Sequence, residues 1–354
     1  MTAFPEAWKK DGGAPPVNQP PHRQGAVVAW LYACAAMVFA MVILGGVTRL
    51  TDSGLSIVEW QPLLGAIPPL NDDDWLAAFA RYRQYPEYQK INPNMTIEDF
   101  RAIYWMEYLH RLWGRLIGLV FLVPFLGFWL AGRLASPLRG RLIAIFLLGG
   151  LQGALGWYMV QSGLVDRPDV SAYRLAGHLG LAVAIYAAIL WTAWGIARPR
   201  GAARGLARGA DALGALVFLA IIAGAFVAGL DAGLIYNTFP LMDGQLLPNG
   251  YWELSPAWRN AFENVTAVQF NHRILAMAVV AAALWFWALT RCARMQAARR
   301  AGFLVALAAL AQAALGIATL VYAVPLALGA LHQAGALVLL TATLRAAHIL
   351  RTTP

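Results

Sequence analysis

Four histidines lie in long apolar segments, two in each half of this 354-residue chain: His110, His178, His272 and His332. A single histidine on an apolar helix is more often a packed, hydrogen-bonded residue than a ligand, although ionisable groups inside a membrane are candidates for function. Two histidines in each half, at a matched depth in the membrane, favour a role as metal ligands. Zinc is a poor candidate, because no cysteine or carboxylate completes a tetrahedral ligand set in both halves. The pattern predicts two hemes, because heme iron takes an axial imidazole from each side.

The composition indicates which elements position these histidines. Hydrophobic residues form 60% of the chain and charged residues 13%, with a mean hydropathy of +0.56, whereas soluble domains have roughly 25% charged residues. Several apolar runs approach the roughly 20 residues that span a bilayer. We therefore predict an all-α polytopic membrane protein with eight transmembrane helices, over residues 27–47, 103–131, 140–160, 173–196, 211–230, 265–290, 302–322 and 326–347.

The charge pattern sets the orientation. A net charge of +9 could suggest nucleic acid, but the arginines cluster in alternate short connections, as the positive-inside rule requires. We expect membrane lipid around the helices, no nucleic acid partner, and both termini on the cytoplasmic side. The two cysteines, Cys34 and Cys292, indicate neither a disulfide framework nor a zinc site.

The two halves repeat each other. The segment Asp52-Ser-Gly-Leu resembles Asp231-Ala-Gly-Leu, Pro62-Leu resembles Pro240-Leu, and Gln152-Gly-Ala-Leu-Gly resembles Gln312-Ala-Ala-Leu-Gly. Because each half has four spans, an even number, the halves are predicted to be parallel four-helix-bundle repeats. We divide the chain into a polar cytoplasmic tail (1–26), an N-terminal repeat (27–197), a basic linker (198–210) and a C-terminal repeat (211–350).

Two long outer loops, 48–102 and 231–264, interrupt this pattern. The segment WLAAFARYRQY in the first loop is typical of an amphipathic or surface helix. Loops of this length more often cover a functional site than merely connect helices.

One difference separates the two histidine pairs. Glu107 precedes His110 by three residues and shares its helix face, whereas the matching residue before His272 is Gln269. A carboxylate can exchange protons and a glutamine cannot, so we predict that Glu107 is catalytic; the alternative is that it merely lies near the aqueous interface.

Arg111 and Arg273 directly follow His110 and His272. They are candidate partners for heme propionates, because guanidinium groups suit carboxylates. The alternative is that both arginines snorkel to the membrane interface.

The motifs EYLHR, RLAGHLG, NHR and ALHQAGA around the four histidines, with GGVTRLTDSGLSIVEWQP after the first span, resemble the heme A synthase family. The resemblance extends from about Trp30 to Leu350. It implies an enzyme of the inner (cytoplasmic) membrane, an oxidoreductase that converts the C8 methyl of heme O to a formyl group and so makes heme A for terminal oxidases. One branch of the family has a cysteine pair in an outer loop; this chain resembles the branch that lacks it.

The resemblance also implies that the two halves bind different hemes. The N-terminal half would bind the substrate heme O between His110 and His178, with Glu107 essential for turnover. The C-terminal half would bind a heme b cofactor between His272 and His332. The implied partners are heme O synthase, the assembly machinery of the terminal oxidase and an electron donor that the sequence does not identify; homo-oligomerisation is allowed by the same analogy.

Two other functions stay open from the residues alone. A bis-histidine diheme electron carrier would share the bundle, but such carriers usually stack their hemes across the bilayer, and here all four histidines are predicted near the outer side. A non-enzymatic heme carrier or oxidase assembly factor would need no Glu107. A transporter is disfavoured because the repeats lack broken helices and midplane charges.

Overall fold

The computed structural model describes residues 21–59, 65, 67–164, 170–197 and 204–352. Within these ranges the chain is helical and contains no strand, and eight helices are long and apolar enough to cross a membrane. The predicted class, an all-α polytopic membrane protein, is therefore confirmed. The eight spans are α1 (Pro21–Leu50), α4 (Ile97–Leu130), α5 (Ser136–Gly163), α6 (Ala172–Ala197), α7 (Arg204–Gly229), α9 (Val265–Arg291), α10 (Gln296–Val321) and α11 (Leu326–Thr352).

Each predicted span corresponds to one of these helices, but several helices begin earlier than the apolar runs do. Helix α4 starts at Ile97 because Thr96 and Asp99 form a reciprocal capping box there. Helix α7 starts at Arg204, so the later part of the range assigned to a basic linker is helical. Residues 1–20 of the predicted tail and 198–203 of the linker lie outside the described residues.

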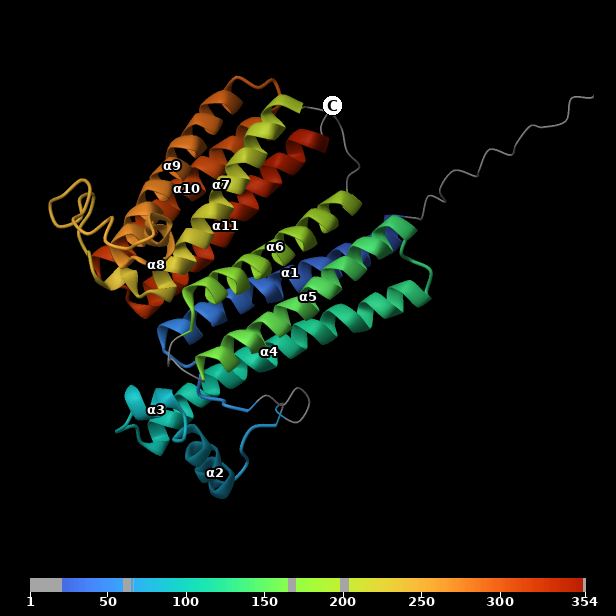
Figure 1. Cartoon of the computed structure of the whole chain (residues 1–354). Coiled ribbons are helices and arrows are strands. Elements are labelled where there is room, and N and C mark those ends of the chain that lie inside the picture. The colour runs from blue at the N-terminus through green and yellow to red at the C-terminus, as the bar shows by residue number, and fades with distance from the viewer. Residues whose placement is uncertain (1–20, 60–64, 66, 165–169, 198–203, 353–354) are drawn as a thin grey trace, which may run out of the picture.

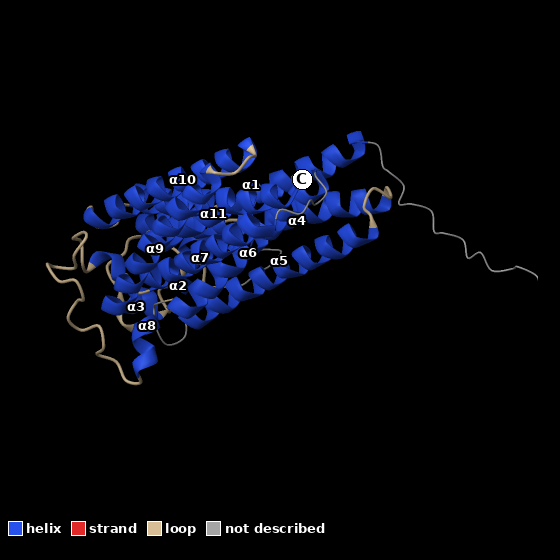
Figure 2. Cartoon of the chain, turned by 90° about the horizontal axis from the view of Figure 1, so that it is seen from above, coloured by secondary structure: helices blue, strands red, loops and turns tan. Residues whose placement is uncertain are grey.

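The contacts divide the eight spans into two groups of four, and the two groups lie beside each other in Figure 1. Helices α1, α4, α5 and α6 contact one another, and so do α7, α9, α10 and α11. The groups meet mainly where α1 packs against α11 and α6 packs against α7. Viewed from above, all the long helices run side by side along one direction (Figure 2).

The short helices gather at one end of the bundle: α2 (Asp72–Tyr82), α3 (Pro86–Lys90) and α8 (Asn260–Glu263), with 3-10 helices at Ala232–Leu234 and Ala257–Arg259. The end of α11 and the start of α1 lie at the opposite end (Figure 1). We refer to the end with the short helices as the outer end.

Helix α2 is the surface helix that the first outer loop was predicted to contain. It buries Trp75, Ala78 and Tyr82 against Phe100, which belongs to the added turns at the start of α4. Burial, together with the nearby Glu87, raises the pKa of the Tyr82 hydroxyl. The aromatic packing explains why α4 continues beyond its apolar run, since these turns cover the loop rather than face lipid.

Candidate functional site

Each of the four histidines packs against a glycine on the span that precedes it in the chain. A Cβ atom placed on that glycine would lie about 3 Å from the histidine Cε1 atom, closer than ordinary van der Waals contact. Glycine is therefore required for the imidazole to sit so near the neighbouring helix. The distances are 3.0 Å for Gly45 and His110, 3.0 Å for Gly156 and His178, 3.1 Å for Gly224 and His272, and 2.7 Å for Gly316 and His332.

Two of these histidines also have a glutamine partner. The side chain of Gln152 donates from Nε2 to the carbonyl of His178 at 3.0 Å, and its Nε2 lies 3.2 Å from the ring Nδ1. Likewise, Gln312 donates from Nε2 to the carbonyl of His332 at 2.9 Å, and its Nε2 lies 3.1 Å from the ring Nδ1. The repeated Gln-x-Ala-Leu-Gly motif therefore places a glutamine and a glycine, one helical turn apart, on one histidine.

Sequence reasoning recognised this motif as a repeat but not as part of the site. It missed Gly45 and Gly224 altogether, although the Asp-x-Gly-Leu repeat, extended back along α1 and α7 with the same offset, would have aligned them. The sequence thus contained the alignment of these two glycines. A glycine in an apolar helix does not indicate a functional contact by itself, because its neighbour on the next helix is not visible in the sequence.

The histidines are half-buried, and those of one half lie near each other. His110 lies within electrostatic range of His178, and His272 lies within range of His332. The buried Nδ1 atom of His110 has no hydrogen-bond partner among the residues that the structure describes. A pair of imidazoles with closely approaching glycine backbones, in an apolar helical bundle, fits the axial ligand set of a heme in both halves.

Glu107 is 3% exposed and anchors the outer loop to α4. Its Oε2 atom accepts hydrogen bonds from the Ser56 hydroxyl and the Ile57 amide, both at 2.7 Å. Its Oε1 atom accepts from Arg111 at 2.6 and 3.0 Å. All four hydrogen bonds are donated to the carboxylate, which makes none in return.

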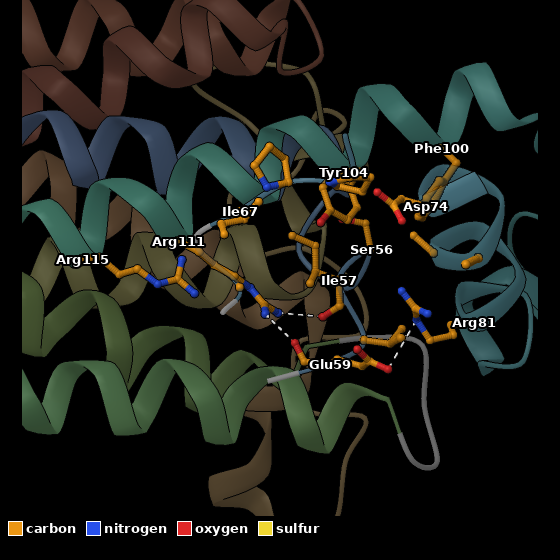
Figure 3. A pocket seen from close by; sticks show the side chains of 16 residues that line it. Ser56, Ile57, Glu59, Ile67, Asp74, Arg81, Phe100, Tyr104, Arg111 and Arg115 are labelled. Atoms are coloured by element: carbon orange, nitrogen blue, oxygen red, sulfur yellow. Dashed lines mark hydrogen bonds and ion pairs between the residues drawn. The ribbon is translucent and has the colours of Figure 1, made fainter. Parts of the chain in front are cut away.

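Arg111 extends the same anchor. Its guanidinium group donates to the carbonyls of Ile57, at 2.7 Å, and Glu59, at 3.1 Å (Figure 3). We call residues 52–59 the N-terminal strap, because Glu107 and Arg111 together bind them to the outer part of α4.

The second half has an equivalent segment, residues 231–238, which we call the C-terminal strap. Arg273 donates to the carbonyls of Tyr236, at 2.6 Å, and Thr238, at 2.8 Å. These positions match Ile57 and Glu59 in the aligned repeats. The first residues of the straps, Asp52 and Asp231, also share a left-handed backbone, with φ of 48° and 50°.

The straps differ in their bonds to the residue one turn before each arginine, and Ile235 stands where Ser56 supplies a hydroxyl in the N-terminal strap. Gln269, 2% exposed, donates from Nε2 to the Tyr236 carbonyl at 3.2 Å, whereas Glu107 accepts from the amide of the matching residue, Ile57. A glutamine therefore holds its strap as a donor, and a glutamate holds its strap as an acceptor. The structure places Arg111 and Arg273 on strap carbonyls, and their contact with propionates stays a prediction.

A cavity of about 290 Å³ lies at the outer end of the N-terminal half. Its lining includes Ser56, Ile57, Glu59, Arg81, Tyr104 and Arg111, which Figure 3 shows around the strap. Arg81 pairs with Glu59 at 3.4 Å across this region. Since Ser56 lines the cavity and bonds to Glu107, the buried carboxylate is one hydrogen bond from it.

These features define a class: a multi-pass α-helical membrane protein with two histidines in each half, each packed against a glycine of a neighbouring span. A family described as cytochrome oxidase assembly protein matches residues 28–344. The heme A synthase of Nitrosospira multiformis is 52% identical, covering 93% of this chain and 94% of its own length. That of Parvibaculum lavamentivorans is 50% identical, covering 88% of this chain and 91% of its own. The chain belongs to the heme A synthase family.

Proposed function

We propose that this protein is an enzyme that oxidises the C8 methyl group of heme O to a formyl group and so produces heme A for terminal oxidases. The names of relatives at about half identity over most of the chain support the activity. The observation that carries the assignment of roles is that Glu107 accepts hydrogen bonds from its strap, whereas Gln269 donates one to the equivalent strap.

In this proposal His110 and His178 hold the substrate heme O, and His272 and His332 hold a resident heme b. When bound by His272 and His332, heme b would supply one-electron redox chemistry. Gln312 and Gly316 orient the His332 imidazole, and Gln152 and Gly156 do the same for His178.

Glu107 is the proposed proton-handling residue of the N-terminal half. Its Oε1 atom is paired with Arg111, so a proton would be taken up at Oε2, which bonds to the Ser56 hydroxyl. That hydroxyl also lies 3.1 Å from the Ser53 carbonyl, to which it can donate instead. Ser56 can therefore relay a proton between the outer cavity and the carboxylate, a general acid–base role that Gln269 has no means to perform.

The proposed location is the cytoplasmic membrane, with both termini inside, as the arginine-rich connections indicate. The outer end of the bundle, with the cavity and both straps, would then face away from the cytoplasm. Heme O synthase would supply the substrate, and the assembly machinery of the terminal oxidase would receive the product.

Co-expression with a heme O synthase, followed by extraction and mass analysis of the hemes, tests the activity. We expect a heme with the mass of the formyl product, and unchanged heme O with the Glu107→Gln variant. Reversible reduction of bound heme without any formyl product from the unaltered protein would instead identify a diheme electron carrier or a heme carrier.

A further inference from the structure

We propose that Gln333 is a positioning residue that couples the two histidine pairs across the contact between α1 and α11. The inference rests on the proposed function, because it assumes that both pairs hold heme. It assigns a role to a residue that is neither an axial ligand nor part of either strap.

The first observation is the bond that Gln333 makes. Gln333 directly follows His332 on α11, and its Nε2 atom donates to the backbone carbonyl of Val42 on α1 at 3.0 Å. Its side-chain oxygen lies almost where a Cβ of Gly46 would be. Only glycine at position 46 leaves room for this carboxamide, so the two residues form one built contact between the halves.

The second observation is the position of the adjacent glycine. Gly45 packs against His110 on α4, and consecutive residues of a helix point about 100° apart. One turn of α1 therefore contacts both halves. Gly45 contacts His110 of the N-terminal half, and Gly46 contacts Gln333, the residue that follows His332 of the C-terminal half. A continuous series of contacts runs from His110 through Gly45 and Gly46 to Gln333 and His332.

The matching contact on the other side of the bundle differs. There Gly224 of α7 packs against His272, and the next residue, Ala225, is buried in an apolar cluster with Ala176 of α6. The residue after His178, equivalent to Gln333, is Leu179, which packs against the same cluster. The polar bond is therefore specific to the α1–α11 side and is not a general requirement for packing the two halves.

A partly buried amide that loses its partner is destabilising, so the Gln333 bond resists sliding of α11 along α1. A ligand that tilts the His332 imidazole must then also move α1 and the glycine that contacts His110. Such coupling is reciprocal, since each site changes the other by the same free energy. The two sites are thus held in one geometry rather than in two independent bundles.

The test is electron paramagnetic resonance of the oxidised, purified protein loaded with heme by co-expression, because the g-values of a bis-imidazole heme report the orientation of its ligands. The signal that depends on His110 is recorded in two states of the protein. In one state the C-terminal site holds heme, and in the other His272→Ala has emptied that site. In the unaltered background we expect this signal to shift when the C-terminal site is emptied. With Gln333→Leu we expect it to be the same in both states.

Gly46→Ala provides an independent variant, because its added methyl group must displace the Gln333 carboxamide without changing Gln333 itself. We expect it to abolish the shift as Gln333→Leu does. Gly118→Ala on α4 is the matched control, since a Cβ there meets no atom within 4 Å, and it should leave the shift intact. Equal thermal melting of the three variants would show that the bundle is preserved.

A shift that persists unchanged in Gln333→Leu and Gly46→Ala, or that is missing in the unaltered background, overturns the inference. These outcomes are distinct from failure of the proposed function, because the spectra need bound heme but no turnover. Two bound hemes that never yield a formyl product would refute the activity and leave the coupling measurable. If no signal depends on His110, both proposals are refuted.

Discussion

The two halves of the bundle hold their straps with the same arginine but with opposite hydrogen-bonding groups one turn before it. Glu107 accepts from the Ile57 amide and the Ser56 hydroxyl, whereas Gln269 donates to the Tyr236 carbonyl. In each half the arginine and the residue one turn before it both bond to the strap, but only the N-terminal half uses a carboxylate for this. Since an amide performs the structural task in the C-terminal half, the proposed role of Glu107 is chemical, because a carboxylate can exchange protons and an amide cannot.

The largest expected effect follows from separating the two sites. His272→Ala should remove heme b while substrate heme remains bound in the N-terminal half, because the two histidine pairs use different helices. Pyridine hemochrome spectra of the purified protein, with mass analysis of the extracted hemes, check this. His110→Ala should give the converse result, and equal loss of both hemes in either variant would contradict separate sites.

Glu107→Gln makes the N-terminal strap chemically similar to the C-terminal one. We expect both hemes to stay bound and heme A formation to fall by roughly 10²–10⁴-fold, the usual contribution of a general acid or base. The rate of formyl product per bound heme is the measurement. The reciprocal Gln269→Glu should not increase that rate, and full activity of Glu107→Gln would remove the distinction between the halves.

The glycine contacts are expected to have a moderate effect. Gly156→Ala places a methyl group about 3 Å from the His178 Cε1 atom, and overpacking of this kind typically costs about 1–3 kcal/mol. We expect weaker retention of the substrate heme during purification. Gly153→Ala lies on the same helix, where a Cβ meets nothing within 4 Å, and it should retain heme as the unaltered protein does.

The smallest effect concerns the outer junction of the halves. Arg49, at the end of α1, pairs with Asp52 and Asp231, the first residues of the two straps, at 2.8 Å each. Both aspartates are largely exposed, so the pairs contribute at most about 1 kcal/mol. Arg49→Gln should lower the melting temperature slightly at low salt and negligibly at high salt. A large loss of stability would show that the straps are held mainly by this arginine.

Much of this organisation follows from local sequence. Apolar runs near the length of a bilayer predict eight spans, and the structure has a helix for each of them. The motifs around His110 and His272 predict an equivalent pair of sites, and the structure gives each histidine an equivalent glycine contact. The predicted ends of the spans were less accurate, because the added turns of α4 depend on capping and on α2 rather than on hydropathy.

By itself, the sequence determined the number of spans, the two histidine pairs and the exchange of glutamate for glutamine between the halves, since each of these is written in residue types and short spacings. Only the tertiary structure decided which groups meet Glu107, why Gly45 and Gly156 are glycines, and that Gln333 reaches Val42. Those contacts join residues far apart in the chain. Their distances depend on how helices pack, and no local pattern specifies that packing.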